Sequence, residues 1–148
     1  MSAGRPRFVV CEDGSEYVER FRRFLGDAFD FVPAKDWAEA RTAVAGAAGV
    51  LLDLDFRRTP PGRLVDESGP APTPLDAGTR ARLAETQGIL ILRQLRAAGV
   101  ACPAILFADF DDADQRGFLE TTLAPLTIAG SRLGLAEIAT LLRAAAGS

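Results

Sequence analysis

The segment "GVLLDLDFRRTPPG", residues 49–62, carries the most information about the fold, because a buried strand in it runs into an acidic end and then into a proline-broken stretch. The apolar residues of "GVLL" would bury both faces of that strand, which is typical of a central strand in a parallel sheet. Asp53 and Asp55 follow at its carboxyl end. A carboxylate there can end the strand, bind a cation or act as a nucleophile, and the rest of the chain has to distinguish these roles.

Outside this segment, short apolar runs alternate with stretches in which apolar residues recur at helical spacing. The expected strands are residues 7–11, 29–33, 49–54, 102–108 and 124–130. The expected helices are residues 17–26, 36–47, 88–99, 111–123 and 134–146. Strands and helices that alternate with short joints predict an α/β fold with a parallel sheet, in a single domain over residues 1–148.

One stretch breaks this alternation, from about residue 56 to residue 86. It holds five prolines, several glycines and few large apolar residues, so residues 56–75 are expected to lack regular structure. Residues 76–87 could form a helical turn or extend the next helix. Loops of this length are usually functional or mobile. Because the stretch leaves the acidic strand end directly, it could cover or flank that site; a tolerated surface insertion is the alternative.

The composition excludes several classes of function. The formal net charge of −3 argues against binding to a nucleic-acid backbone. The chain has no histidine, which removes histidine-based catalysis and most zinc sites, and Lys35 is its only lysine. No apolar run is long enough to span a membrane or resembles a secretion signal, so a cytoplasmic protein is expected. Cys11 and Cys102 lie beside apolar runs, which favours buried, reduced thiols over a disulfide.

Acidic residues gather at the ends of two expected strands. Glu12 and Asp13 follow the first strand, and Asp53 and Asp55 follow the third. If these strands are neighbours, the carboxylates converge at one edge of the sheet, where they would repel one another unless a cation is present. A hard divalent ion such as Mg²⁺ is the natural partner of such a set. The alternative is that these acids only cap helices and solvate loops.

The order of elements and three motifs resemble the receiver domain of bacterial two-component response regulators, a CheY-like, flavodoxin-like α/β fold with five parallel strands, doubly wound. "FVVCEDG" is similar to the first receiver strand with its acidic pair, and "VLLDLDF" to the third strand. "GILILRQLRAAGVACPAILF" is similar to the third helix and fourth strand. The resemblance covers nearly the whole chain except about residues 56–86, which form an insertion after the third strand.

The resemblance implies a specific chemistry for the acidic residues. Asp53 falls on the aspartate that accepts the phosphoryl group. Asp13, Asp53 and a backbone carbonyl near Asp55 would hold Mg²⁺, with Glu12 nearby, and the metal would neutralise charge during an in-line transfer. The Asp55 side chain falls at a variable position and would be secondary. The resemblance also implies a protein partner, either a histidine kinase or a downstream effector, and a homodimer surface within residues 110–146.

Other receiver positions depart from the pattern. Where receivers place a threonine or serine after the fourth strand, this chain has Ala108, followed by Asp109. In the fifth strand, the positions of the aromatic switch residue, the lysine and the proline read as Pro125, Ile128 and Ala129. Without the lysine, the negative charge of the phosphoryl group has no fixed cation beside it. Without the hydroxyl and the aromatic residue, the side chains that usually change position on phosphorylation are missing. The residues that could substitute are Arg57, Arg58 and Arg132 as cations and Ser131 as a hydroxyl donor.

The sequence thus predicts a stand-alone, atypical receiver that is not an enzyme and acts through protein–protein interaction, with phosphorylation of Asp53 absent, weak or differently coupled. One alternative is a Mg²⁺-dependent phosphatase of the haloacid dehalogenase type. There, Asp53 would be the nucleophile and Asp55 the general acid, and the acidic cluster Asp109, Asp111 and Asp112 would echo a later metal motif. The other alternative is a structural interaction module whose acids bind nothing.

Overall fold

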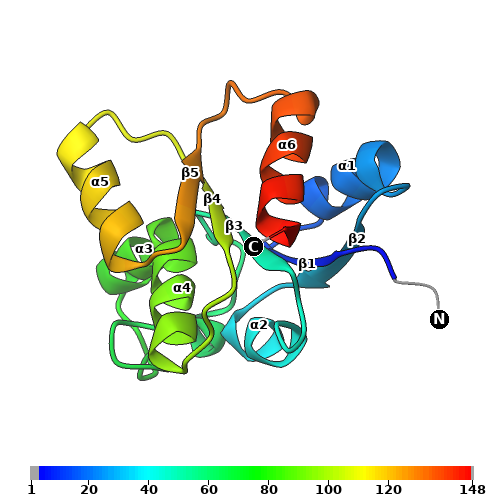
Figure 1. The fold of residues 1–148 in the computed structure, drawn as a ribbon. Helices are drawn as coiled ribbons and strands as arrows, with labels where there is room; N and C mark the ends of the chain where they lie inside the picture. Colours follow the sequence, from blue (N-terminus) through cyan, green and yellow to red (C-terminus); the bar gives the residue numbers. More distant parts are fainter. Residues whose placement is uncertain (1–3, 148) are drawn as a thin grey trace.

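Five parallel strands form the centre of the molecule, side by side in the order β2-β1-β3-β4-β5 (Figure 1). The structure is a computed structural model and describes residues 4–147. The strands are β1 (Arg7–Cys11), β2 (Asp30–Ala34), β3 (Gly49–Asp53), β4 (Ala104–Phe107) and β5 (Leu126–Ala129). The predicted α/β fold with a five-stranded parallel sheet is confirmed, and the strand that ends in Asp53 lies at its centre, between β1 and β4.

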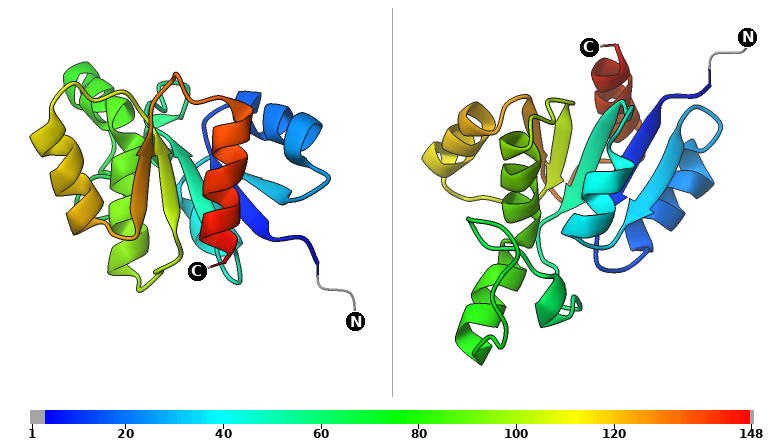
Figure 2. Two further views of the ribbon diagram at one scale, coloured as in Figure 1. Left: turned by 45° about the horizontal axis from the view of Figure 1, so that its top comes forward. Right: turned by 90° about the horizontal axis from the view of Figure 1, so that it is seen from below.

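Helices cover both faces of this sheet, which makes the fold doubly wound (Figures 1 and 2). The helices are α1 (Glu16–Leu25), α2 (Trp37–Ala43), α3 (Ala77–Glu85), α4 (Gln87–Ala97), α5 (Ala113–Thr122) and α6 (Leu135–Ala146). Residues of α1 and α6 pack on one face with Phe8, Leu51 and Phe107. Residues of α2, α4 and α5 pack on the other face with Val9 and Leu52. Successive strand residues point to opposite faces, so each strand contributes to both cores.

The stretch after β3 is folded into the core. Phe56, Leu64 and Val65 are at most 1% exposed and belong to the same buried cluster as the apolar residues of α4. The regular elements of the stretch are a short 3-10 turn, η1 (Pro61–Arg63), and helix α3. Most of residues 56–75 is irregular, as expected. Its three large apolar side chains Phe56, Leu64 and Val65 are nevertheless part of the core.

The buried side chain of Gln87 holds this stretch against α4. Its amide oxygen accepts a hydrogen bond from the Val65 N–H at 2.8 Å, and its amide nitrogen donates to the Val65 carbonyl at 3.1 Å. The same nitrogen also donates to the Leu83 carbonyl at 3.0 Å. Buried backbone groups need partners. Here the side-chain amide of Gln87 supplies the hydrogen-bond partners of the Val65 N–H and carbonyl, a role that a neighbouring strand would otherwise fill.

The two cysteines are both free thiols, as expected. Cys11 is buried and Cys102 is partly buried. Over residues 4–147, no helix is long and apolar enough to cross a membrane.

Candidate functional site

The carboxyl ends of β1 and β3 lie side by side and bring two acidic loops together. Cys11 of β1 pairs with Leu52 of β3, so Glu12 and Asp13 continue β1 beside Asp53. The first and third strands are neighbours, which is the condition under which the sequence placed these carboxylates at one edge. In open α/β sheets, ligands bind beyond the carboxyl ends of the strands where the strand order reverses, and in this sheet the order reverses between β1 and β3.

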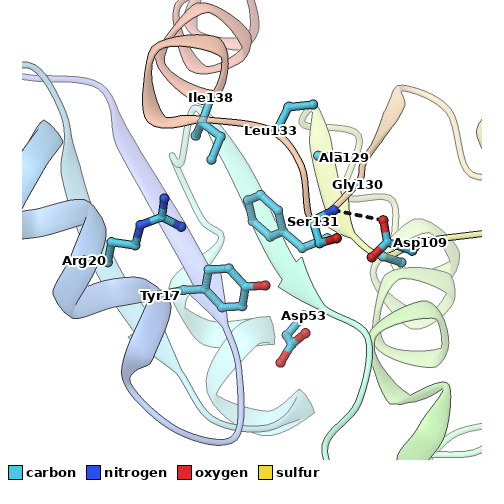
Figure 3. A pocket seen from close by; sticks show the side chains of 11 residues that line it. Tyr17, Arg20, Asp53, Asp109, Ala129, Gly130, Ser131, Leu133 and Ile138 are labelled. Atoms are coloured by element: carbon cyan, nitrogen blue, oxygen red, sulfur yellow. Dashed lines mark hydrogen bonds between the residues drawn. The ribbon is translucent and has the colours of Figure 1, made fainter.

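Asp53 ends β3 and lines a pocket of about 300 Å³ (Figure 3). Its carboxylate accepts a hydrogen bond from the Leu54 N–H at 2.9 Å. Burial raises the pKa of Asp53 to about 6, and the negative charges of Asp13, Glu12 and Asp55 add to this rise. A carboxyl group with this pKa is mostly ionised at pH 7 and titrates close to neutrality.

The pocket beside Asp53 has an aromatic wall and several polar groups. It is lined by Tyr17, Arg20, Asp53, Phe107, Ala108, Asp109, Ala129, Gly130, Ser131, Leu133 and Ile138. The rings of Tyr17 and Phe107 stack with their centroids 4.8 Å apart. The Ser131 N–H donates to the Asp109 carboxylate at 2.9 Å, and this bond joins the loops after β4 and β5 (Figure 3).

Beside Phe107, which pairs in register with Asp53, the residues that β4 and β5 bring to this pocket include two alanines. Ala108 follows β4, and Ala129 ends β5 in register with Phe107. Ile128 is buried in the cluster on the opposite face of the sheet. Of the residues expected at the receiver positions of the fifth strand, Ala129 is therefore the one that lies on the Asp53 side. Its methyl group carries no charge to offer a phosphoryl group.

Asp13 is bound by an arginine from the stretch after β3. The Arg58 N–H donates to one Asp13 oxygen at 2.9 Å, and its guanidinium donates to the other at 3.0 Å. The guanidinium also bonds both oxygens of Glu16, at 2.9 and 3.0 Å. These bonds raise the pKa of Arg58 further and lower the pKa of Glu16. The Asp13 side chain is left only 4% exposed.

Glu12 and Asp55 are bonded to groups close to them in sequence. The Glu12 carboxylate accepts hydrogen bonds from the N–H groups of Tyr17 at 3.1 Å and Val18 at 2.9 Å, so it caps the start of α1. Burial raises the pKa of Glu12, and these two bonds oppose the rise. Asp55 accepts from the Arg57 N–H at 2.9 Å and pairs with its guanidinium at 2.6 Å.

The expected Mg²⁺ ligands, Glu12, Asp13, Asp53 and Asp55, therefore have separate hydrogen-bond partners. In the described part of the chain, no three acidic, histidine or cysteine side chains are grouped so that they could hold a metal ion. A Mg²⁺ ion needs several oxygen ligands in near-octahedral geometry. Both oxygens of Asp13 are bonded to Arg58. This arrangement does not fit a divalent ion.

The residues proposed as substitutes end up in different places. Arg58 reaches Asp13, Arg57 pairs with Asp55, and Ser131 lines the pocket of Asp53, whereas Arg132 is outside the pocket lining. The prediction from the sequence missed Tyr17 and Arg20, which also line this pocket. They lie three residues apart on an amphipathic helix and so share a face. That spacing is the signal that could have found them.

The acids that suggested a phosphatase have structural partners. Asp109 is bonded to the Ser131 N–H, and Asp112 caps α5 by accepting from the Asp114 N–H at 2.9 Å. Asp55, the proposed general acid, is paired with Arg57. The carboxylates of Asp55, Asp109 and Asp112 are thus engaged in structural contacts.

Comparison with known proteins shows what this fold is similar to. The chain matches no protein-family model and no curated protein. It is similar to the receiver domain of the Francisella response regulator 1452, with a TM-score of 0.66, 14% identity and coverage of 97% of this chain and 98% of that one. It is also similar to the BeF3-activated receiver domain of Klebsiella pneumoniae RstA, with a TM-score of 0.65, 18% identity and coverage of 96% and 99%.

A third similar structure is adenylate cyclase from Rhodopirellula baltica, with a TM-score of 0.64, 9% identity and coverage of 97% of this chain and 89% of that one. Proteins with different descriptions thus match about equally well, and all three identities are low. Such matches establish the fold and not the activity. The chain has the CheY-like fold of response-regulator receiver domains.

Proposed function

We propose that this chain is a receiver-fold signalling domain that acts by binding a protein partner and in which phosphorylation of Asp53 does not drive the conventional switch. The observation that carries the proposal is the surroundings of Asp53. Its acidic neighbour Asp13 is bonded to Arg58, and Ala108 and Ala129 line the Asp53 pocket at positions where receivers carry polar or charged side chains.

Asp53 is kept in this proposal as the candidate phosphoacceptor. It lies at the end of the central strand and lines a pocket with Arg20 and Ser131, which could contact a phosphoryl group. Transfer to a carboxylate depends on fixed positive charge where negative charge develops. Because Arg58 is already bonded to two carboxylates, the charge available to Asp53 is weak, and phosphorylation would be slow.

The coupling from Asp53 to the rest of the fold is also weakened. A receiver switch needs a side chain with two discrete positions that responds to the phosphoryl group. In this chain, Phe107 is buried against Tyr17, and Ile128 is buried on the far face of the sheet. Neither side chain stands where an aromatic switch residue of β5 would be exposed, so in this proposal the partner reads the surface of the domain instead.

The partner surface in this proposal lies within residues 110–146. Helix α5 buries Leu119 alone among its described residues, and Phe118 on the same helix is 60% exposed. Single exposed apolar side chains are common on protein surfaces, so Phe118 serves as the position on α5 from which the proposed contact is tested. The proposal takes residues 1–148 as one domain in the bacterial cytoplasm, with a histidine kinase, a downstream effector or a second copy as partner.

The proposal is tested by treating the protein with acetyl phosphate and measuring its intact mass, with Asp53→Asn as the control. A partner is identified by photo-crosslinking from position 118. Its affinity is then measured for the native protein treated with acetyl phosphate and for Asp53→Asn. We expect little phosphorylated protein, and we expect the partner to bind both proteins with equal affinity. Stoichiometric phosphorylation that changes the affinity, and that Asp53→Asn removes, would contradict the proposal.

A further inference from the structure

Arg58 joins two parts of the chain that are far apart in sequence. Its partners Asp13 and Glu16 lie 45 and 42 residues away, in the loop after β1 and at the start of α1. The backbone N–H and the guanidinium of this one residue contact both oxygens of Asp13. Two carboxylates on one guanidinium make a fork of charge-assisted hydrogen bonds, which are stronger than neutral ones.

The loop after β1 is shaped to receive this guanidinium. A Cβ atom on Gly14 would lie 2.5 Å from Arg58 Nη2 and 2.5 Å from both carboxylate oxygens of Glu16. Any larger residue at position 14 would therefore displace the guanidinium or Glu16. The missing side chain of Gly14 leaves the space in which the arginine lies against the backbone.

The stretch that carries Arg58 is itself anchored. Phe56, two residues earlier, is fully buried, and Arg63 pairs with Asp36 at 2.9 Å. Because Phe56 and Arg63 anchor the chain on either side of Arg58, the arginine stays close to Asp13 and competes for it at a high effective concentration. A free ion would have to displace a tethered competitor that is already bonded to both Asp13 oxygens.

We infer that the Arg58 guanidinium is the resident cation of Asp13, so that the native protein binds no divalent ion there and loss of this guanidinium opens a divalent-ion site at Asp13 and Asp53. The carboxylate oxygens that Mg²⁺ prefers are present at the ends of β1 and β3, but those of Asp13 are covered. This inference does not depend on the proposed signalling role, because it concerns the internal contacts of the chain.

The experiment is a titration of the native protein with Mg²⁺ followed by amide NMR, repeated with Arg58→Ala. Arg57→Ala is the matched control, because it removes the neighbouring arginine, whose partner is Asp55. We expect no saturable shift at residues 13 and 53 in the native and Arg57→Ala proteins. In Arg58→Ala we expect saturable shifts there, with an affinity at least about tenfold above the upper limit that the native titration sets, the factor that follows from losing one charge-assisted hydrogen bond.

Paramagnetic Mn²⁺ provides a second readout, since it broadens only the amides close to the bound ion. Broadening at residues 13 and 53 is expected in Arg58→Ala and should disappear when Asp13→Asn is added. If Arg58→Ala does not fold, as judged by circular dichroism, Arg58→Gln replaces it. Saturable Mg²⁺ binding at Asp13 in the native protein, or no gain in affinity in a folded Arg58 variant, would overturn the inference.

Discussion

Gly88 and Asp53 lie in direct contact, because a Cβ atom on Gly88 would be 2.0 Å from the Asp53 carbonyl oxygen. The Gly88 N–H also donates to the Leu54 carbonyl at 3.0 Å. The first turn of α4 therefore rests on the end of the strand that carries the candidate phosphoacceptor. The position of Asp53 depends on the absence of a side chain at residue 88.

Replacing Gly88→Ala should destabilise the fold by about 1–3 kcal/mol, the usual cost of inserting a methyl group into a packed site. The free energy of unfolding is measured by urea denaturation. Gly117→Ala is the matched control, because Gly117 is also helical and a methyl group there would meet no neighbouring heavy atom within 4 Å. The control should be neutral or stabilising by up to about 1 kcal/mol. Equal effects of the two changes would contradict the contact.

Replacing Gln87→Leu should leave the buried N–H and carbonyl of Val65 without their side-chain partner. Each buried polar group that loses its partner costs about 1–3 kcal/mol. The amide of Val65 should also exchange its hydrogen faster, which NMR measures directly. Gln94→Leu is the control, since Gln94 makes longer bonds, of 3.3 and 3.2 Å, to the carbonyls of Asp66 and Glu67. A Val65 amide that stays protected in Gln87→Leu would refute this role.

The pKa of Asp53 predicts a pH dependence of stability. Its pKa is about 6 in the folded chain and 3.8 ordinarily, so between these pH values the folded state holds more protons than the unfolded state. The contribution of Asp53 to stability therefore falls as the pH rises from about 3.8 to about 6. Asp53→Asn should remove this slope and raise the free energy of unfolding at pH 7.

The pH dependence of stability that Asp109 contributes should have the opposite sign to that of Asp53. Hydrogen bonds from Ser131 lower its pKa, so its contribution is present at neutral pH and is lost as the pH falls through the folded value. Asp109→Asn should therefore reduce stability at pH 7 where Asp53→Asn increases it. Carboxyl ¹³C shifts followed over pH report both groups. An Asp53 carboxyl that titrates near pH 4 would be inconsistent with its burial at the end of β3.

Because the ring of Phe118 is exposed, its removal should affect binding to other molecules but not the free energy of unfolding. Phe118→Ala should change the free energy of unfolding by less than about 0.5 kcal/mol, because the ring is 60% exposed. It should weaken partner binding or self-association, measured by sedimentation. Phe24→Ala is the control, since Phe24 is 57% exposed but lies on α1, far from α5 (Figure 1). Equal losses from both changes would exclude a specific surface on α5.

The sheet and its acidic edge could be predicted from the sequence, because their signals are local. A run such as "GVLLD", apolar on both faces, is typical of a central strand in a parallel sheet. Asp53 was found in this way. Helix α3 could also be predicted, because Asp76 is a residue type that often begins a helix, and it caps α3 by accepting a hydrogen bond from the Thr79 N–H at 2.8 Å.

The partners of the acidic residues could not be predicted, because they depend on the path of an irregular stretch. The sequence offers Arg57 and Arg58 next to each other, and nothing local indicates that one turns to Asp55 and the other to Asp13. The burial of Phe56 fixes that path. The partners of Glu12 could not be predicted either, because they are backbone N–H groups of α1, which every non-proline residue has.

Whether Asp53 drives a switch is best tested by an amide NMR titration of the native protein with beryllofluoride and Mg²⁺, with Asp53→Asn as control. Beryllofluoride is a stable mimic of a phosphoryl group on the aspartate. We expect no concerted shift over residues 110–146, whether or not amides beside Asp53 respond. Shifts that spread through β5 and α6 in the native protein and vanish in Asp53→Asn would show a working phosphoryl switch and would refute the proposed function.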